Sequence, residues 1–173
     1  MALQGKRVAV LVEDSYQELE VWYPLLRLRE AGVEVFAVGR QAGHTYTSKL
    51  GYPVTADRGI TEVSATDLDG VVIPGGWAPD YMRRHASFVN LVRAMNGLGK
   101  VVAAICHAGW LLCSAGVVRD RRATCFFSIK DDLVNAGATY LDEPVVVDGN
   151  LITSRTPDDL PHFCREILRA LDR

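Results

Sequence analysis

Apolar runs that are typical of buried strands alternate with helical patterns along this chain, and this alternation constrains the fold more than any other sequence feature. The strand-like runs lie at 7–12, 33–38, 69–76 and 100–105. The helical patterns lie at about 15–31, 88–98, 107–115, 129–137 and 156–173. Near-continuous apolar strands with helices between them predict one α/β domain over residues 1–173, with a mostly parallel sheet between two helical layers.

Local signals place the ends of several elements. In the first helical region Leu19, Trp22, Tyr23 and Leu26 recur at helical spacing. Ser15 and Glu18 fit a capping box at the start of that helix.

Two further segments predict hairpins, and the last helix carries its own start signals. The segment 44–57 predicts an antiparallel excursion that turns at Leu50-Gly51, and 144–153 predicts a hairpin that turns at Asp148-Gly149. Thr156 is expected to cap the last helix, with Pro157 at its first position.

Composition and charge exclude several classes of function. The net charge of −2 provides no basic field, so we expect no nucleic-acid partner. No segment approaches the apolar length that spans a bilayer, so no membrane partner is expected. The apolar run between Arg7 and Glu13 is too short for a signal peptide, and these features together predict a cytoplasmic location.

The four cysteines are expected to be free thiols. They are Cys106, Cys113, Cys125 and Cys164, and no C-x-x-C pair is present. No other cysteine or histidine stands at ligand spacing from Cys106, so we expect neither a metal nor a cofactor. Cys113, Cys125 and Cys164 are interpreted as packing residues.

Cys106 is the candidate nucleophile because it stands where a buried strand turns into a helix. A side chain at such a turn is held up into the cleft, and Ala104, Ala108 and Gly109 supply the small neighbours that the turn needs. A helix that starts at His107 would point free N–H groups at the sulfur and lower the pKa of the thiol. The alternative is a small apolar residue at the end of a core strand.

Two other strand ends should meet Cys106 at the carboxyl edge of the sheet. Gly75-Gly76 could let backbone N–H groups form an oxyanion hole, although a plain turn explains the pair equally well. Glu20 precedes Pro24 by four residues, and a carboxyl at such a kink could lie beside the thiol. The two groups would then compete for one proton, with Glu20 as the expected protonated partner. The pattern alone does not rank Glu20 above Glu18, which is expected to be exposed.

Five segments of the chain, in order, resemble the PfpI-like branch of the DJ-one/PfpI superfamily. They are "YQELEVWYPLLRLREAGVEV", "VVIPGGWAPD", "AICHAGWLL", "SIKDDLVNAGA" and "VVVDGNLITSRTPDDL", within a likeness that runs from about residue 7 to 171. The resemblance implies a flavodoxin-like three-layer sandwich of the class I glutamine amidotransferase-like type. It also implies a homo-oligomer, a dimer in some members and a hexamer in others.

The same resemblance assigns roles at the site. It implies a nucleophilic Cys106 followed by His107, with Glu20 as the glutamate that hydrogen-bonds the thiol. It matches the oxyanion-hole amides to Gly75, Gly76 and His107.

Two positions depart from the family's pattern. The acid that reaches the histidine of a neighbouring subunit corresponds to Asp80, where peptidase-type members carry the longer glutamate. This difference puts a protease triad in doubt. Phe126 and Phe127 stand where related chains often have tyrosine and proline.

Three functions are therefore carried forward. The first is a stress-response enzyme that acts on glyoxal, methylglyoxal or early glycated adducts through Cys106, as a glyoxalase or deglycase. Such chemistry needs a nucleophile, an acid/base group and an oxyanion donor, but no cofactor. The second is an intracellular cysteine peptidase, and the third is a redox sensor or chaperone that works by oxidation of Cys106.

Overall fold

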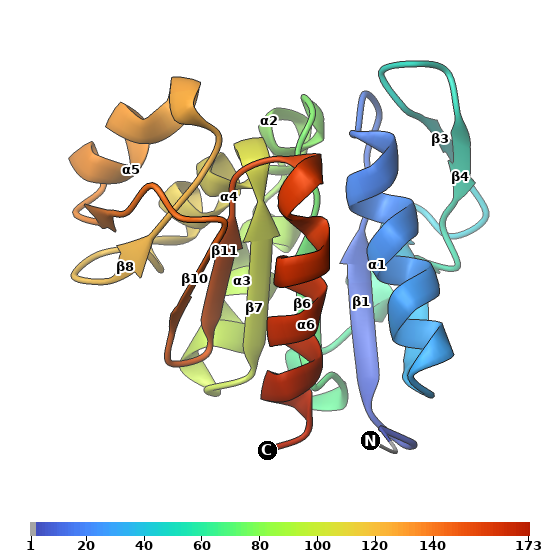
Figure 1. Cartoon of the computed structure of the whole chain (residues 1–173). Helices are drawn as coiled ribbons and strands as arrows, with labels where there is room; N and C mark the ends of the chain where they lie inside the picture. The colour runs from blue at the N-terminus through green and yellow to red at the C-terminus, as the bar shows by residue number, and fades with distance from the viewer. Residues whose placement is uncertain (1–2) are drawn as a thin grey trace.

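A seven-stranded sheet forms the centre of the computed structural model, which describes residues 3–173 (Figure 1). Residues 1–2 of the predicted domain lie outside the described residues. The strand order is β10-β11-β7-β6-β1-β2-β5, and every neighbouring pair is parallel except β10 with β11. The strands are β1 (Arg7–Leu11), β2 (Glu34–Gly39), β5 (Arg58–Gly59), β6 (Gly70–Ile73), β7 (Val101–Ile105), β10 (Val145–Asp148) and β11 (Leu151–Ser154).

Helices cover both faces of this sheet. Figure 1 shows α1 (Glu18–Glu30) and α6 (Leu160–Leu171) in front of it, and α3 (Ala86–Gly97) and α4 (Gly109–Ala115) behind it. The short helices α2 (Ala78–Met82) and α5 (Lys130–Asn135) lie toward the carboxyl ends of the strands. Strands covered on both faces are buried along their length, as β6 and β7 are at every residue. The predicted three-layer α/β sandwich with a mostly parallel sheet is confirmed.

Two small sheets flank the main one. The hairpin of β3 (Thr45–Thr47) and β4 (Pro53–Thr55) is antiparallel, as the sequence predicted. The strands β8 (Arg122–Ala123) and β9 (Thr139–Tyr140) pair in parallel. The hairpin of β10 and β11 is also confirmed, but Asp148 pairs with Leu151, so the turn residues are Gly149-Asn150 and the predicted position was one residue early.

Helix α1 forms where the apolar spacing predicted it, but residues that define this spacing do not all face the sheet. Leu19 and Leu26 are more than half exposed, whereas Val21, Leu25 and Leu28 are buried against the sheet. The helix therefore carries apolar residues on both sides, and spacing alone does not identify the side that packs.

The predicted helix caps are also corrected. Gln17 caps α1 by accepting a bond from the Glu20 amide at 3.0 Å, while Ser15 lies before the helix with a φ of 61°. The side chain of Thr156 accepts no capping bond and instead donates to Asp159 Oδ2 at 3.4 Å, because a 3₁₀ turn precedes α6.

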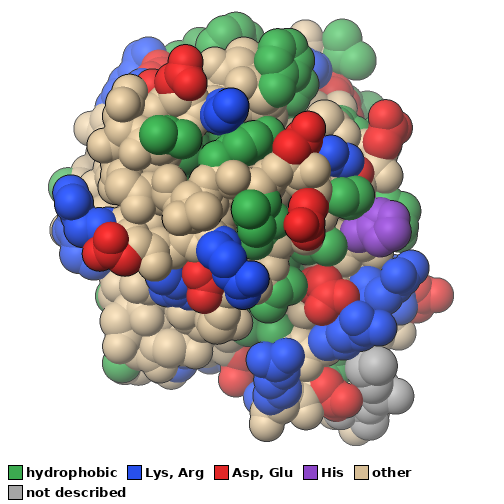
Figure 2. Space-filling view, turned by 60° about the vertical axis from the view of Figure 1, so that its left-hand side comes forward, with side chains coloured by type: hydrophobic (Ala, Val, Ile, Leu, Met, Phe, Trp, Pro, Cys, Tyr) green, Lys and Arg blue, Asp and Glu red, His purple; other side chains and the backbone are tan. Residues whose placement is uncertain are grey.

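The surface shows charges of both signs. On the face turned forward in Figure 2, blue and red side chains are interspersed among apolar and uncharged atoms, which accords with a net charge near zero. Within residues 3–173, no helix is both long and apolar enough to cross a membrane.

Candidate active site

The thiol of Cys106 lies at the carboxyl edge of the sheet, directly after β7. Cys106 has a φ of 61°, a left-handed conformation that is strained for a side chain other than glycine. The chain continues as a 3₁₀ turn over Cys106–Ala108 and then as α4, so the predicted helix from His107 begins slightly later, at Gly109. The sharp strand-to-helix turn at Cys106 is thereby confirmed.

Small residues let α4 pass close to its neighbours. Ala104 and Ala108 are buried, and a Cβ added at Gly109 would lie 2.6 Å from the side chain of Leu133. Cys106 itself is only 7% exposed, so little of the residue is accessible to solvent in the single chain.

Glu20 is brought to the same place from α1. It is fully buried, and its Oε2 accepts a bond of 2.6 Å from the Gly75 amide. Its Oε1 has no hydrogen-bond partner among the described residues. Burial raises the pKa of this carboxyl to about 7, against the opposing effect of the Gly75 bond. The structure thus separates Glu20 from Glu18, which the helix pattern alone did not, and it buries the glutamate that the resemblance pointed to.

Glu18 is not the exposed glutamate that the sequence predicted. It accepts a hydrogen bond from the Ser48 hydroxyl, and a bond of 2.8 Å from the Leu50 amide. These contacts tie the start of α1 to the β3–β4 hairpin.

The thiol of Cys106 does not have the lowered pKa that the sequence predicted. Burial raises its pKa, and the negative charge of Glu20 raises it further. The amides of His107 and Gly76 point at the sulfur and act in the opposite direction, but they do not outweigh burial. Cys106 and Glu20 therefore form a coupled pair in which burial raises both pKa values, and the expectation that Glu20 is the protonated partner remains a prediction.

The Gly75-Gly76 loop supplies one oxyanion donor rather than two. Because the Gly75 amide is bonded to Glu20, Gly76 and His107 remain as the amides that face the sulfur. Gly76 has a φ of 71°, and a Cβ there would lie 2.4 Å from the carbonyl oxygen of Ser15. The loop needs glycine at this point because the Ser15 segment passes against it.

His107 turns toward the thiol. Its Nδ1 lies 3.2 Å from Cys106 Sγ, and its Nε2 lies 3.4 Å from the Ser128 hydroxyl. Burial lowers the pKa of His107, and the nearby Lys49 lowers it further. Lys49, from the β3–β4 hairpin, had no signal in the sequence, since only the fold brings that hairpin to the sheet edge.

Asp80 lies on α2 and is held by neighbouring arginines. Its carboxylate accepts bonds of 2.9 and 3.0 Å from Arg83 and 2.5 Å from Arg84, and these bonds, with Arg84 foremost, lower its pKa. Within residues 3–173, no bond joins Asp80 to His107. Contact with a histidine of another subunit remains a prediction.

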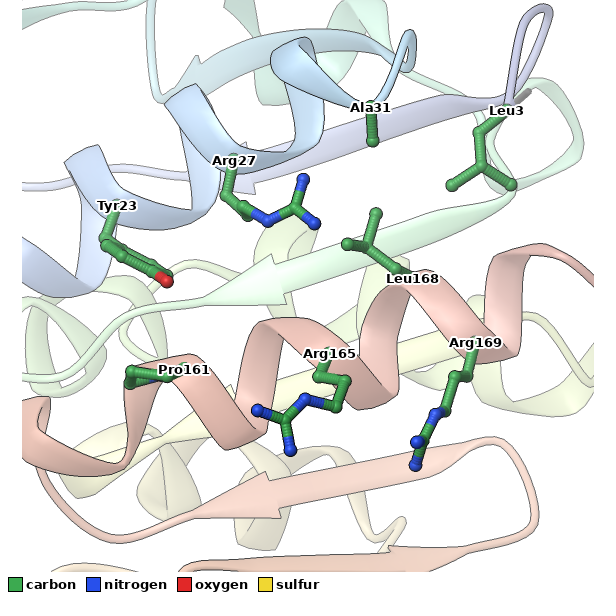
Figure 3. A pocket seen from close by; sticks show the side chains of 8 residues that line it. All are labelled: Leu3, Tyr23, Arg27, Ala31, Pro161, Arg165, Leu168 and Arg169. Atoms are coloured by element: carbon green, nitrogen blue, oxygen red, sulfur yellow. The ribbon is translucent and has the colours of Figure 1, made fainter. Parts of the chain in front are cut away.

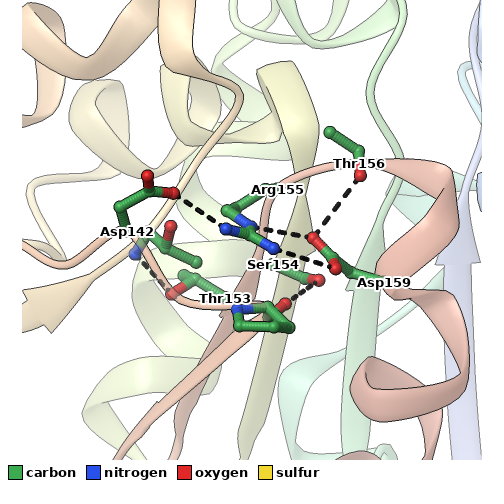
Figure 4. A network of polar contacts seen from close by, with 8 residues as sticks. Asp142, Thr153, Ser154, Arg155, Thr156 and Asp159 are labelled. Atoms are coloured by element: carbon green, nitrogen blue, oxygen red, sulfur yellow. Dashed lines mark hydrogen bonds and ion pairs between the residues drawn. The ribbon is translucent and has the colours of Figure 1, made fainter.

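A charged network braces the neighbouring strand end (Figure 4). Arg155 follows β11, whose Ser154 pairs with Ile105 just before the thiol. Its guanidinium donates to Asp142 Oδ1 at 2.9 Å and to both oxygens of Asp159 at 2.9 and 3.2 Å. The network ties the start of α6 to the loop before β10, beside the site.

The other three cysteines pack against the core as predicted, to different depths. Cys125 and Cys164 are buried, whereas Cys113 is only half-buried and its Sγ lies 3.7 Å from the Asp132 carbonyl oxygen. In the part of the chain that the structure describes, no three acids, cysteines or histidines stand together as a metal site would require.

A groove of about 570 Å³ lies elsewhere, between α1 and α6 (Figure 3). Arg27 extends into the space between the two helices, whereas Arg165 and Arg169 extend from the far side of α6 (Figure 3). The guanidinium groups do not converge on one point, and the groove contains none of the residues around Cys106.

The chain thus combines an α/β sandwich with a cysteine on a strained turn next to a buried glutamate. A family model described as the DJ-1/PfpI family matches residues 6–170, and the chain belongs to this family.

Named relatives match along nearly their whole length. Protein/nucleic acid deglycase 2 of Escherichia coli (strain K12) is 46% identical over 169 residues, which cover 96% of this chain and 98% of the relative. Two Bacillus subtilis (strain 168) proteins are also similar. Putative cysteine protease YraA is 41% identical and the match covers 96% of this chain and 99% of the relative, while General stress protein 18 is 40% identical with 98% and 99% covered.

Solved structures share the fold. A two-domain Anabaena variabilis protein with DJ-1/ThiJ/PfpI-like and ferritin-like domains superposes with a TM-score of 0.95 at 45% identity, covering 96% of this chain and 48% of that one. DJ-1beta of Drosophila melanogaster superposes with a TM-score of 0.91 at 32% identity, covering 97% and 91%.

Proposed function

We propose that this protein is a stress-response enzyme that converts glyoxal or methylglyoxal, free or as an early adduct on a protein amine, into a hydroxy acid. The observation that carries the proposal is the coupled pair of Cys106 and Glu20. A buried carboxyl with a pKa of about 7 beside a thiol can both take and return a proton at neutral pH. Relatives named as deglycases support the same chemistry.

The first step forms a carbon–sulfur bond. Sγ attacks the aldehyde carbon of methylglyoxal as the thiol proton passes to the Glu20 carboxylate. The aldehyde oxygen gains the negative charge, faces the amides of Gly76 and His107, and then takes that proton to give a hemithioacetal. Since the pKa of the thiol is raised, proton transfer accompanies attack instead of preceding it.

The second step moves a proton between carbons. A base removes the proton from the former aldehyde carbon and returns it to the former ketone carbon. The hydroxyl proton passes from the oxygen of the first carbon to the oxygen of the second, which leaves a lactoyl thioester on Cys106. Glu20 and the neutral His107 are the groups in reach of the sulfur for this task. Water then cleaves the thioester, so that methylglyoxal and water give lactic acid and the free thiol.

An early adduct of methylglyoxal on a protein amine would react with the same catalytic groups. When the aldehyde carbon carries an amine as a hemiaminal, loss of that amine adds one step and the products are the free amine and lactate. This balance needs water and no oxidant or reductant.

Peptide hydrolysis is the second candidate, since one relative is named as a cysteine protease. A protease needs an acid that orients the histidine to protonate the leaving amine. In this chain Asp80 is bonded to Arg83 and Arg84, and His107 Nε2 faces the Ser128 hydroxyl. The geometry of a single chain therefore favours aldehyde chemistry.

Redox sensing is the candidate from another class. Glu20 Oε1 is buried without a partner among the described residues, and a protonated carboxyl there could donate to an oxidised Cys106. Selective oxidation of Cys106 by peroxide, followed by mass spectrometry, tests this alternative.

Assembly and location remain predictions. The exposed Leu19, Tyr23 and Leu26 on α1 provide an apolar stripe that a second copy could cover, which supports the proposed homo-oligomer. A cytoplasmic location and the lack of a nucleic-acid partner rest on the sequence alone.

The test is methylglyoxal consumption with lactate detection, without glutathione. We expect turnover by the wild type, loss of turnover in Cys106→Ala, and a reduction of at least about 100-fold in Glu20→Gln, the usual contribution of general acid–base catalysis. Cys113→Ala, which removes a thiol outside the site, is the matched control. Equal turnover in all four proteins, or none in the wild type, would refute the proposal.

A further inference from the structure

A continuous row of aromatic rings lies beside the thiol of Cys106, with His107 as the member that contacts the sulfur. We call Trp77, His107, Trp110, Phe126 and Phe127 the aromatic collar. Trp77 and Trp110 stack with centroids 6.0 Å apart, and Trp110 meets His107 edge-on at 5.0 Å. His107 stacks on Phe126 at 4.8 Å, and Phe126 contacts Phe127 at 4.6 Å.

The centre of this collar is the site itself. His107 Nδ1 lies 3.2 Å from Cys106 Sγ, and the Phe126 amide donates to the Cys106 carbonyl at 3.3 Å. Trp77 directly follows Gly76, whose amide faces the sulfur. Three residues of the collar are thus linked to the thiol, either by direct contact or through an adjacent backbone group.

The middle of the collar is held rigidly. The indole N–H of Trp110 donates to Asp132 Oδ2 at 2.8 Å, and the Arg83 guanidinium lies 5.2 Å from the centre of the Trp110 ring. Rings fixed in this way lose little conformational freedom when a ligand stacks on them. The collar is preorganised.

The ends of the collar are open. Trp77 is 55% exposed and Phe127 is 74% exposed, an unusual degree for large apolar side chains next to a buried reactive group. Aromatic faces of this kind stabilise a planar group by stacking, beyond the area that the contact buries.

We infer that the aromatic collar makes this site select carbonyl compounds that carry a planar aromatic substituent, with Trp77 and Phe127 as specificity-determining residues. The reacting end of such a compound meets Cys106, and its ring lies on the collar. The inference rests on the proposed function for the aldehyde chemistry, but the binding preference can be measured without turnover.

Mandelate and lactate provide a matched pair of probes, because both are α-hydroxy acids and they differ in phenyl against methyl. Their dissociation constants would be measured by NMR shifts of the tryptophan indoles. We expect mandelate to bind the wild type more tightly by about 2- to 13-fold or more, the range that one aromatic contact supplies. Trp77→Leu and Phe127→Leu keep apolar volume and remove the ring, so each should reduce this preference.

Tyr52→Leu is the control, because Tyr52 is also an exposed aromatic residue but packs on Trp22 instead of the collar. Its preference for mandelate should equal that of the wild type. Equal binding of the two acids by the wild type, including the case in which a second copy covers Trp77, would overturn the inference. So would a preference that survives in both ring variants.

Turnover separates this inference from the proposed function. The ratio of kcat/KM for phenylglyoxal to that for methylglyoxal should fall in Trp77→Leu and Phe127→Leu as the binding preference does. Preferred binding of mandelate with no turnover of either aldehyde would refute the enzyme and leave the collar standing. Turnover with an unchanged ratio of kcat/KM in both ring variants would support the enzyme and refute the role of the collar in specificity.

Discussion

Replacing Glu20 by glutamine should change how the stability of this protein depends on pH. Glutamine has the same shape and can still accept the bond that Glu20 Oε2 receives from the Gly75 amide at 2.6 Å. It removes only the charge and the titration. The difference in unfolding free energy between the two proteins therefore isolates the buried carboxyl.

The magnitude follows from the pKa. Burial raises the pKa of Glu20 from 4.5 to about 7, and this rise corresponds to about 3 kcal/mol. Below pH about 4.5 the carboxyl is protonated in both the folded and the unfolded protein, so its charge costs nothing. Above pH about 7 it is ionised in both, and the folded state bears the full cost of the buried charge.

The stability of the wild type thus falls as pH rises, whereas a salt-bridged carboxylate makes stability rise with pH. As pH rises from 4.5 to 7, the wild type should lose about 3 kcal/mol of stability relative to Glu20→Gln. Urea unfolding at a series of pH values measures the difference. Glu30→Gln is the control, since the Glu30 side chain is 74% exposed, and it should give a curve parallel to the wild type. A flat difference for Glu20→Gln, or one that favours the wild type at high pH, would show that burial does not raise the pKa of Glu20.

Two matched pairs of variants test the backbone and the core. Gly76→Ala should destabilise the protein by about 1–3 kcal/mol or more, because Gly76 has a φ of 71° and an added Cβ would meet Ser15. Gly97→Ala on α3 should stabilise the protein by about 0.5–1 kcal/mol, because no atom lies within 4 Å of the added Cβ and alanine favours the helix. Leu28→Ala should cost about 2–5 kcal/mol by leaving a cavity, and Leu26→Ala should change stability by less than about 0.5 kcal/mol. Thermal or urea unfolding measures all four, and equal effects within either pair would contradict the structure.

The sequence predicted the layers of the fold because the signals are local. A strand buried on both faces needs an unbroken apolar run, as in β7, and each such run is visible without knowledge of its neighbours. The same holds for the turn at Cys106, where small residues on either side accompany the strained φ of 61°. No local signal identifies the face of α1 that packs on the sheet, because the helix carries apolar residues on both faces.

The features of the candidate site also divide into those with a local sequence signal and those that depend on the fold. Local sequence signals place a thiol on a sharp turn at the carboxyl edge of a parallel sheet, with two glycines at the next strand end. The helix pattern did not rank Glu20 above Glu18, and only the family resemblance pointed to Glu20. The fold supplies the physical reason, because the rotation of α1 about its axis buries Glu20 against the Gly75 amide. The shared burial of Cys106 and Glu20 also follows from the fold and has no local signal. The local amides favour a thiolate, but desolvation by the whole surrounding fold is larger, and it raises the pKa of Cys106 and of Glu20 together.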